Sequence, residues 1–147
     1  MGIVRRAVLD DLPALVALEQ FFPGDRLSRR KLRYFLKTHA DLWVFEEAGA
    51  ILGDAVVLYR QGSPAARLYS LIVHPIARGR GVAAALLEHA EQAALDCGCL
   101  LMRLEVREDN LAALRLYQKH GYQVIGRTAD YYQDHGSAIR MRKELTR

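Results

Sequence analysis

Glycine and arginine alternate at one point of the chain, in the run Arg78-Gly79-Arg80-Gly81. An alanine-rich segment with helical periodicity follows at once, so this run stands where a helix begins. Glycine has no side chain to cover its backbone, and bare amides at the positive end of a helix dipole bind phosphate. Each arginine adds a fixed positive charge and a fork of N–H donors. The run therefore predicts a binding site for a phosphorylated ligand.

A carboxylate stands on the polar side of a later segment. Apolar and polar residues alternate from residue 102 to residue 107, as on a β-strand, so one face holds Arg103, Glu105 and Arg107. A strand inside a sheet is expected to be covered on both faces, and a polar face there predicts an open cleft in place of a second core. Glu105 is thus a candidate general base. The alternative is a surface carboxylate that pairs with Arg103 or Arg107.

Three more polar residues could take part in chemistry. Tyr117 follows Asn110 by two turns of a leucine-rich helical segment, and this spacing alone favours a tyrosine of the core. Asn110 itself stands where a helix N-cap is expected. His74, beside Pro75 at the end of a strand, is a rival base because imidazole changes charge near neutral pH. The alternative for His74 is an exposed histidine without a role.

Periodicity and chain breakers define the elements that must hold these residues. A break at Pro23-Gly24-Asp25 separates the first two helices. In chain order we expect a strand Ile3–Ala7, a helix capped by Asp10 or Asp11 that runs through Phe21-Phe22, a helix capped by Ser28, strands Leu42–Glu46 and Ile51–Tyr59, a strand ending at Val73, a helix Gly79–Asp96, a strand Leu100–Val106, a helix from Asn110 to Gly121, and strands Tyr122–Arg127 and Ala138–Leu145.

The order of these elements predicts the fold. The strands on either side of Glu47-Ala48-Gly49 are expected to form a hairpin. The middle of the chain alternates strand, helix, strand and helix, which favours a parallel pair joined by a right-handed crossover, whereas the flanks favour antiparallel pairing. The chain is therefore expected to be an α/β (α+β) protein, with a mixed sheet of about seven strands covered by about four helices.

Length and composition set the class of protein. The 147 residues suit a single domain, and 51% hydrophobic with 26% charged residues is the balance of an ordinary globular protein. No run of about eighteen apolar residues exists, so a membrane span is not expected. The first residues lack the apolar stretch of a signal peptide, and Arg6 stands where a myristoylation site needs Ser or Thr. A cytoplasmic protein is expected.

Two groups of residues raise the question of metal or anion binding. Cys97 and Cys99 match neither a redox pair nor a zinc knuckle, so we expect reduced packing residues and no metal. A basic run contributes to the net charge of +4 and contains Arg26, Arg29, Arg30, Lys31, Arg33 and Lys37. A solvated helix face explains the run, and the alternative is an attraction for anions. No nucleic-acid-binding motif is present, so a nucleic-acid partner is not expected.

The glycine run can be matched to two phosphate-binding motifs. Gly79-x-Gly81-x-x-Ala84 fits the fingerprint of dinucleotide-binding folds. In those folds the first glycine follows the strand almost directly. Here the residues from His74 to Arg78 intervene, and Pro75 ends the strand early. The strand-turn-helix context of the fingerprint is missing, which makes a dinucleotide the weaker interpretation.

The second match is better. Arg78-x-x-Gly81-x-Ala83, preceded by a hydrophobic strand and Val73-His74-Pro75, resembles the acyl-coenzyme-A loop of the GNAT superfamily of N-acetyltransferases. The resemblance covers essentially the whole chain, residues 1–147, as one domain, and is strongest to bacterial ribosomal-protein N-alpha-acetyltransferases (the RimI type). The chain also resembles acetyltransferase modules fused to C39-like peptidase domains. The features shared with the RimI type are the strand Arg103–Arg107, the Asn-capped helix to Leu116-Tyr117, Gly121-Tyr122 and Tyr131-Tyr132.

The resemblance implies acetyl-CoA as cosubstrate and a GNAT-like mixed, mostly antiparallel sheet with a central parallel pair. The pantetheine arm is expected to pair like an extra strand with the backbone of Leu71, Ile72 and Val73, which also suit a buried core strand. The asparagine equivalent to Asn110 touches the cofactor in relatives. The residues implied at the pyrophosphate are Arg78, Gly79, Arg80, Gly81, Val82, Ala83 and Ala84.

The resemblance also implies catalytic roles and an acceptor. The family's base falls at Glu105, and its thiolate-protonating tyrosine falls at Tyr117. A phenol holds its proton more tightly than a thiol, so a hydrogen bond to the thiolate is the alternative role for that tyrosine. The acceptor is expected to be a primary amine. A peptide or protein N-terminal α-amine is favoured over a lysine because far more of it is neutral at pH 7.

The residues that are expected to line the acceptor site include both matches to the family and departures from it. Tyr131 and Tyr132 favour a peptide-like groove, with strand-edge packing as the alternative. Ser137 replaces an acidic residue usual in the family, and Phe22–Leu27 lacks the Pro-Trp-Ser type of sequence. A small amine, a protein lysine and a non-catalytic acyl-CoA sensor or partner module stay as alternatives. The protein is expected to be a monomer or a homodimer.

Overall fold

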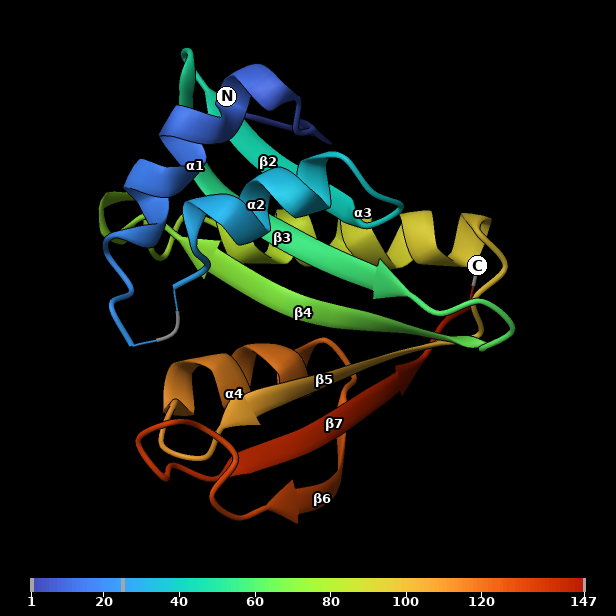
Figure 1. Cartoon of the computed structure of the whole chain (residues 1–147). Helices are drawn as coiled ribbons and strands as arrows, with labels where there is room; N and C mark the ends of the chain where they lie inside the picture. Colours follow the sequence, from blue (N-terminus) through green and yellow to red (C-terminus); the bar gives the residue numbers. More distant parts are fainter. Residues whose placement is uncertain (1, 25, 147) are drawn as a thin grey trace.

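The computed structural model describes residues 2–24 and 26–146, and within these residues seven strands form one sheet (Figure 1). The sheet order is β1-β2-β3-β4-β5-β7-β6, and every neighbouring pair is antiparallel except the parallel pair β4 and β5. The predicted fold class and its central parallel pair are confirmed. The strands are β1 (Ile3–Arg6), β2 (Asp41–Glu47), β3 (Ala50–Tyr59), β4 (Ala65–Val73), β5 (Leu101–Arg107), β6 (Gln123–Thr128) and β7 (Ala138–Glu144).

Four α-helices cover the described part of the sheet, two on each face. Leu15 and Leu32 belong to the core between the sheet and the first two helices, which lie in front of it in Figure 1. Leu86 and Tyr117 belong to the larger core on the other face. The helices are α1 (Leu12–Glu19), α2 (Arg29–Leu36), α3 (Val82–Asp96) and α4 (Leu111–Lys119), with short 3-10 turns η1 (Leu9–Asp11) and η2 (Pro75–Ala77).

The connection between α1 and α2 differs in part from the prediction. α1 ends at Glu19, so Phe21-Phe22 lies in the turn that follows the helix and not in the helix. Asp25, the last residue of the predicted break, lies outside the described residues. The predicted start of α2 is confirmed, because Ser28 Oγ accepts a hydrogen bond from the Lys31 amide at 3.1 Å.

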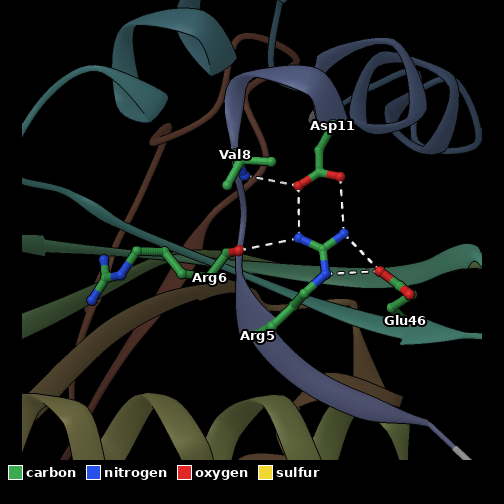
Figure 2. Close-up of polar contacts among 5 residues, drawn as sticks. All are labelled: Arg5, Arg6, Val8, Asp11 and Glu46. Carbon is green, nitrogen blue, oxygen red and sulfur yellow. Dashed lines mark hydrogen bonds and ion pairs between the residues drawn. The ribbon is translucent and has the colours of Figure 1, made fainter.

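An ion-pair network around Arg5 replaces the predicted side-chain cap of the first helix (Figure 2). The guanidinium donates to both oxygens of Asp11 at 2.8 and 2.9 Å and to Glu46 Oε1 at 2.7 Å. Asp11 Oδ2 also accepts from the Val8 amide at 2.8 Å, so this carboxylate does not cap α1. The hydrogen bonds from Arg5 hold the pKa of Asp11 below its ordinary value. The network joins β1, η1 and β2.

The two cysteines of the chain differ in burial. Cys99 is free and buried, as predicted, whereas Cys97 is free but exposed because it lies at the C-terminal cap of α3. Its predicted packing role is therefore wrong.

No helix among the described residues is long and apolar enough to cross a membrane. The basic run forms a solvated helix face, as predicted, with exposed Arg29, Arg30, Lys31 and Arg33 on α2.

Candidate active site

The pairing between β4 and β5 ends before either strand does. Backbone partners run from Ala65 opposite Leu101 to Leu68 opposite Leu104 and stop there. Beyond that point the described residues of β4 pair only with β3, and those of β5 pair only with β7. The two ribbons diverge toward the left of Figure 1. We call this divergence, between residues 69–73 of β4 and residues 105–107 of β5, the seam.

The glycine run lies where β4 leads into α3. Gly79 and Gly81 adopt φ angles of +78° and +80°, so α3 begins at Val82 and not at Gly79, because an α-helix needs negative φ. A Cβ built on either glycine would meet no atom within 4 Å. Among the described residues the amides of 79–84 donate no hydrogen bond, and Ala85 is the first donor, to the Gly81 carbonyl at 3.0 Å. Free amides in open space at a helix N-terminus fit a phosphate group.

The two arginines of the glycine run differ in their contacts. Arg80 Nη2 donates to Glu47 Oε2, at the end of β2, at 2.5 Å. This hydrogen bond holds the pKa of Glu47 below its ordinary value. Arg78 is exposed, and its guanidinium lies 5.9 Å from the centre of the Phe22 ring. Arg78 can thus approach a phosphate directly, whereas Arg80 must release the Glu47 carboxylate before it can bind a phosphate.

His74 has a structural contact that neither of its sequence interpretations included. Its Nδ1 accepts a hydrogen bond from the Ile76 amide at 3.1 Å, and its ring centre lies 4.4 Å from that of Phe21. The imidazole therefore caps η2 and is half-buried, which shapes the exit from β4. Among the described residues, no group of three or more His, Cys, Asp or Glu side chains is placed to hold a metal ion.

Glu105 lies on β5 at the seam, on the sheet face that carries α1 and α2. Its side chain is 12% exposed, and Arg67 Nε donates to one oxygen and Arg103 Nη1 to the other, each at 3.3 Å. The alternative of a pair with Arg103 is thus confirmed, whereas Arg107 pairs with Asp134 at 2.9 Å. Strong charge-assisted bonds measure about 2.7–2.9 Å, so both contacts of Glu105 are loose. The carboxylate is thus not held in a tight ion pair.

Two residues of the α4 region lie on the other side of β5. Tyr117 is 7% exposed in the core under α3 and α4, with its ring centre 5.6 Å from that of Tyr122. The core position favoured by periodicity is confirmed, and burial raises the pKa of its hydroxyl above the ordinary value. The predicted cap at Asn110 is confirmed too, because its Oδ1 accepts from the Ala113 amide at 3.1 Å.

Arg67 is the site residue that sequence reasoning missed. Besides Glu105 it reaches the Tyr131 hydroxyl, to which its Nη2 donates at 3.0 Å across the seam. Its guanidinium lies 5.4 Å from the centre of the Tyr69 ring, whose hydroxyl accepts from Lys31 Nζ at 2.5 Å. The available signal was the alternation of Arg67 and Tyr69 with apolar neighbours, which extends β4 toward the N-terminus.

The acetyltransferase (GNAT) family model matches residues 10–122, well over half of the chain. The chain belongs to this family. An acetyltransferase of Yersinia enterocolitica is 40% identical over 82 residues, which cover 54% of this chain and 55% of that protein. The chain thus spans about half the length of the curated relatives it matches.

Solved structures of GNAT proteins share the fold along the full chain. The ribosomal-protein-S18-alanine N-acetyltransferase of Escherichia coli is 25% identical with a TM-score of 0.89, covering 100% of this chain and 96% of that chain. Ard1 of Thermoplasma volcanium is 24% identical with a TM-score of 0.91, covering 99% of each chain. The fold implied by the sequence resemblance is confirmed. Acetyl-CoA is the cosubstrate that GNAT acetyltransferases use.

Proposed function

We propose that this chain transfers the acetyl group of acetyl-CoA to the N-terminal α-amine of a peptide or protein, as enzymes of the RimI type do. The seam is the observation that carries the proposal. It combines an unpaired backbone edge at Leu71–Val73, free amides at residues 79–84 and a carboxylate at Glu105 on the facing strand. A long thioester cosubstrate needs such a path from a phosphate site to a base.

Backbone groups hold the cosubstrate in this proposal. The amides from Gly79 to Ala84 bind the diphosphate, and Arg78 and Arg80 add positive charge. The pantetheine arm adds to the edge of β4 along Leu71–Val73, as an extended peptide adds to a sheet. Asn110 contacts the cofactor from the start of α4. Acetyl-CoA supplies the activated acyl group, and residues 1–147 act as one domain.

Glu105 and Tyr117 approach the acyl group from opposite faces of β5. Glu105 accepts the amine proton, directly or through water, as the nitrogen bonds to the acetyl carbon. Tyr117 donates a hydrogen bond or a proton to the sulfur as the C–S bond breaks. Because burial raises the pKa of Tyr117, its phenol stays protonated, and hydrogen bonding to the thiolate is its main contribution.

An N-terminal acceptor is favoured by the share of the amine that is neutral at pH 7 and by the surroundings of Glu105. A peptide α-amine has a pKa near 8, so about a tenth of it is neutral at pH 7, against about one lysine side chain in two thousand. Glu105 is a single carboxylate with two guanidiniums at 3.3 Å, and an α-amine suits it better because it loses its proton more readily than a lysine side chain. Tyr131 stands over this site through its contact with Arg67 and can line a peptide.

The test has two steps. Calorimetry with acetyl-CoA measures cosubstrate binding, and thiol release then measures turnover against a panel of amines. The panel contains peptides with varied first residues, the same peptides with blocked N-termini and an internal lysine, and a polyamine. We expect micromolar acetyl-CoA binding and turnover only with free peptide N-termini. Binding without turnover across the panel would support a sensor, and turnover of the blocked peptides or the polyamine would reassign the acceptor.

A further inference from the structure

The sheet face that carries Glu105 is rich in positive charge. Arg140 on β7 is the direct partner of Glu105 on β5, and Arg142 is that of Arg103. Directly opposed residues of antiparallel strands place their side chains on the same face. The charged residues on and over this face are Arg67, Arg103, Arg107, Arg140, Arg142 and Lys31, against the carboxylates Glu105, Asp134 and Glu144.

Among the described residues, three of these cations, Arg67, Arg103 and Arg140, have loose carboxylate contacts or no ion pair. Arg67 and Arg103 share the single carboxylate of Glu105 at 3.3 Å, whereas the ion pair of Arg6 with Asp41 in the other half of the sheet measures 2.6 Å. Arg140 forms no ion pair among the described residues. Its guanidinium lies across the backbone of Gly126, where any Cβ would collide with it. Positive charge without a described carboxylate partner thus lies on β7, the strand beside that of the proposed base.

Positive charge beside Glu105 acts on the acceptor in two ways. It lowers the pKa of a nearby ammonium group, which raises the share of neutral nucleophile. It also attracts a carboxylate carried by the acceptor and repels a second amine or guanidinium. No helix lies in front of β5 and β7 in Figure 1, so an extended peptide can follow this face away from the seam.

We propose that Arg67, Arg103 and Arg140 form an anion subsite beside the acetyl-transfer centre and select peptide N-termini whose second residue is Asp or Glu. The inference rests on the proposed function and names its substrate class. Guanidinium groups match carboxylates in planar, bidentate geometry, and the exposed Arg103 and Arg140 are free to turn toward one. Arg67 contacts both Glu105 and Tyr131 and forms the inner wall of the subsite.

The test compares three peptides that start with Ala and differ only at the second residue, which is Glu, Gln or Lys. Thiol release gives kcat/KM for each peptide. We expect the Glu peptide to exceed the Gln peptide by about tenfold, and the Gln peptide to exceed the Lys peptide, because a hydrogen bond between charged groups contributes this much. The preference should shrink as salt rises from about 0.05 to 0.5 M, because salt screens exposed charges.

A charge reversal sharpens the test. Arg140→Glu should bring the Lys peptide level with the Glu peptide or above it. Arg60→Glu is the matched control, because Arg60 is an exposed arginine that follows β3, beyond the paired end of the sheet, and the substitution changes net charge equally. The control should keep the order Glu, Gln, Lys, which separates a local subsite from the overall charge of the protein.

The outcomes distinguish this inference from the proposed function. The uncharged Gln peptide tests acetyl transfer alone, so its turnover with equal kcat/KM for all three peptides overturns only the anion subsite. Binding of acetyl-CoA with no turnover of any peptide overturns both. Turnover of free glutamate without turnover of the Glu peptide overturns the peptide assignment. Inhibition by a single-stranded RNA of about twenty nucleotides, with no preference among peptides, would assign the face to nucleic acid instead.

Discussion

In the half of the sheet from β1 to β4, helices cover both faces at β2 and β3, whereas from β5 to β6 the described helices cover only one face (Figure 1). Charged residues in the covered half form short ion pairs, such as Arg5 with Asp11 at 2.8 Å. In the open half, Arg67 and Arg103 contact Glu105 only at 3.3 Å, and Arg140 forms no ion pair among the described residues. The covered half can hold a cosubstrate rigidly, and the open half leaves charge for an acceptor. The seam lies where the two halves separate.

Two carboxyl groups show the same contrast. Asp54 on β3 is fully buried beside Glu19 of α1, and burial together with the Glu19 charge raises the pKa of Asp54 well above its ordinary value. No described donor bonds to either Asp54 oxygen, so we expect a proton shared with Glu19 to satisfy the pair. Glu105 instead accepts hydrogen bonds from two guanidinium groups, those of Arg67 and Arg103. The buried carboxyl pair with raised pKa values therefore marks the packing of α1, and the geometry of the seam marks the candidate for chemistry.

The largest effect is expected at Glu105, where the open half would lose its proposed base. Glu105→Gln keeps the size of the side chain but removes the proton acceptor, so kcat should fall by about 10²–10⁴-fold. Acetyl-CoA affinity should stay within about twofold, because the proposed diphosphate and pantetheine contacts come from backbone groups elsewhere. Thiol release and calorimetry measure the two quantities.

The control for this substitution is Glu88→Gln, which removes an exposed carboxylate on α3. Turnover of the control should match that of the unmodified protein. Turnover of Glu105→Gln at the same level would remove Glu105 from the chemistry and leave its role as the ion-pair partner of Arg67 and Arg103.

A smaller effect is expected in the glycine run. Gly81→Ala places a Cβ at φ +80°, which costs about 1–2 kcal/mol of stability, and it also obstructs the diphosphate. We expect acetyl-CoA binding to weaken by about tenfold or more, equal to about 1.4 kcal/mol. Gly62→Ala is the matched control, because Gly62 has φ +79° and equally open surroundings in the β3–β4 loop. Equal losses of affinity in both variants, measured by calorimetry, would mean that backbone strain alone is responsible.

The residues around Glu105 show which part of the candidate site the sequence could predict and which part it could not. Strand alternation is local, so Glu105 and its neighbours Arg103 and Arg107 could be assigned to one face. Arg67 and Arg140 reach the same face only through the registers of β4 and β7, which depend on pairing between segments far apart in sequence. The Glu19–Asp54 pair was missed for the same reason, because no local pattern shows that α1 places a glutamate over β3.

A third effect is expected on stability, at the buried pair of the covered half. Both pKa values are raised, so above about pH 4 the native state binds more protons than the unfolded chain, and stability falls as pH rises toward neutrality. Asp54→Asn keeps the size of the side chain, donates to Glu19 and needs no proton. The unfolding temperature of this variant should therefore fall less between pH 5 and pH 8 than that of the unmodified protein. At pH 8 it should be the higher of the two.

A buried polar group without a partner costs about 1–3 kcal/mol, so the gain at pH 8 should amount to a few degrees. Thermal unfolding followed by circular dichroism across this pH range measures it, with Glu88→Gln as the control for an exposed carboxylate. A steeper fall of the unfolding temperature with pH in Asp54→Asn would mean that a bound cation, and not a shared proton, satisfies the pair.

The smallest effect is expected where the glycine run touches the covered half, at the exposed pair of Arg80 with Glu47. The hydrogen bond lowers the pKa of Glu47, so the pair is formed at neutral pH and is lost only as pH falls through that lowered value. Glu47→Gln should free Arg80 for the diphosphate and tighten acetyl-CoA binding about two- to threefold at low salt, as exposed ion pairs contribute little. Glu144→Gln, which removes the partner of Arg142 on β7, is the control and should change nothing. Weaker binding in Glu47→Gln would mean that the carboxylate holds Arg80 in position for the phosphate, and the glycine run would then share the fixed, paired charges of the covered half.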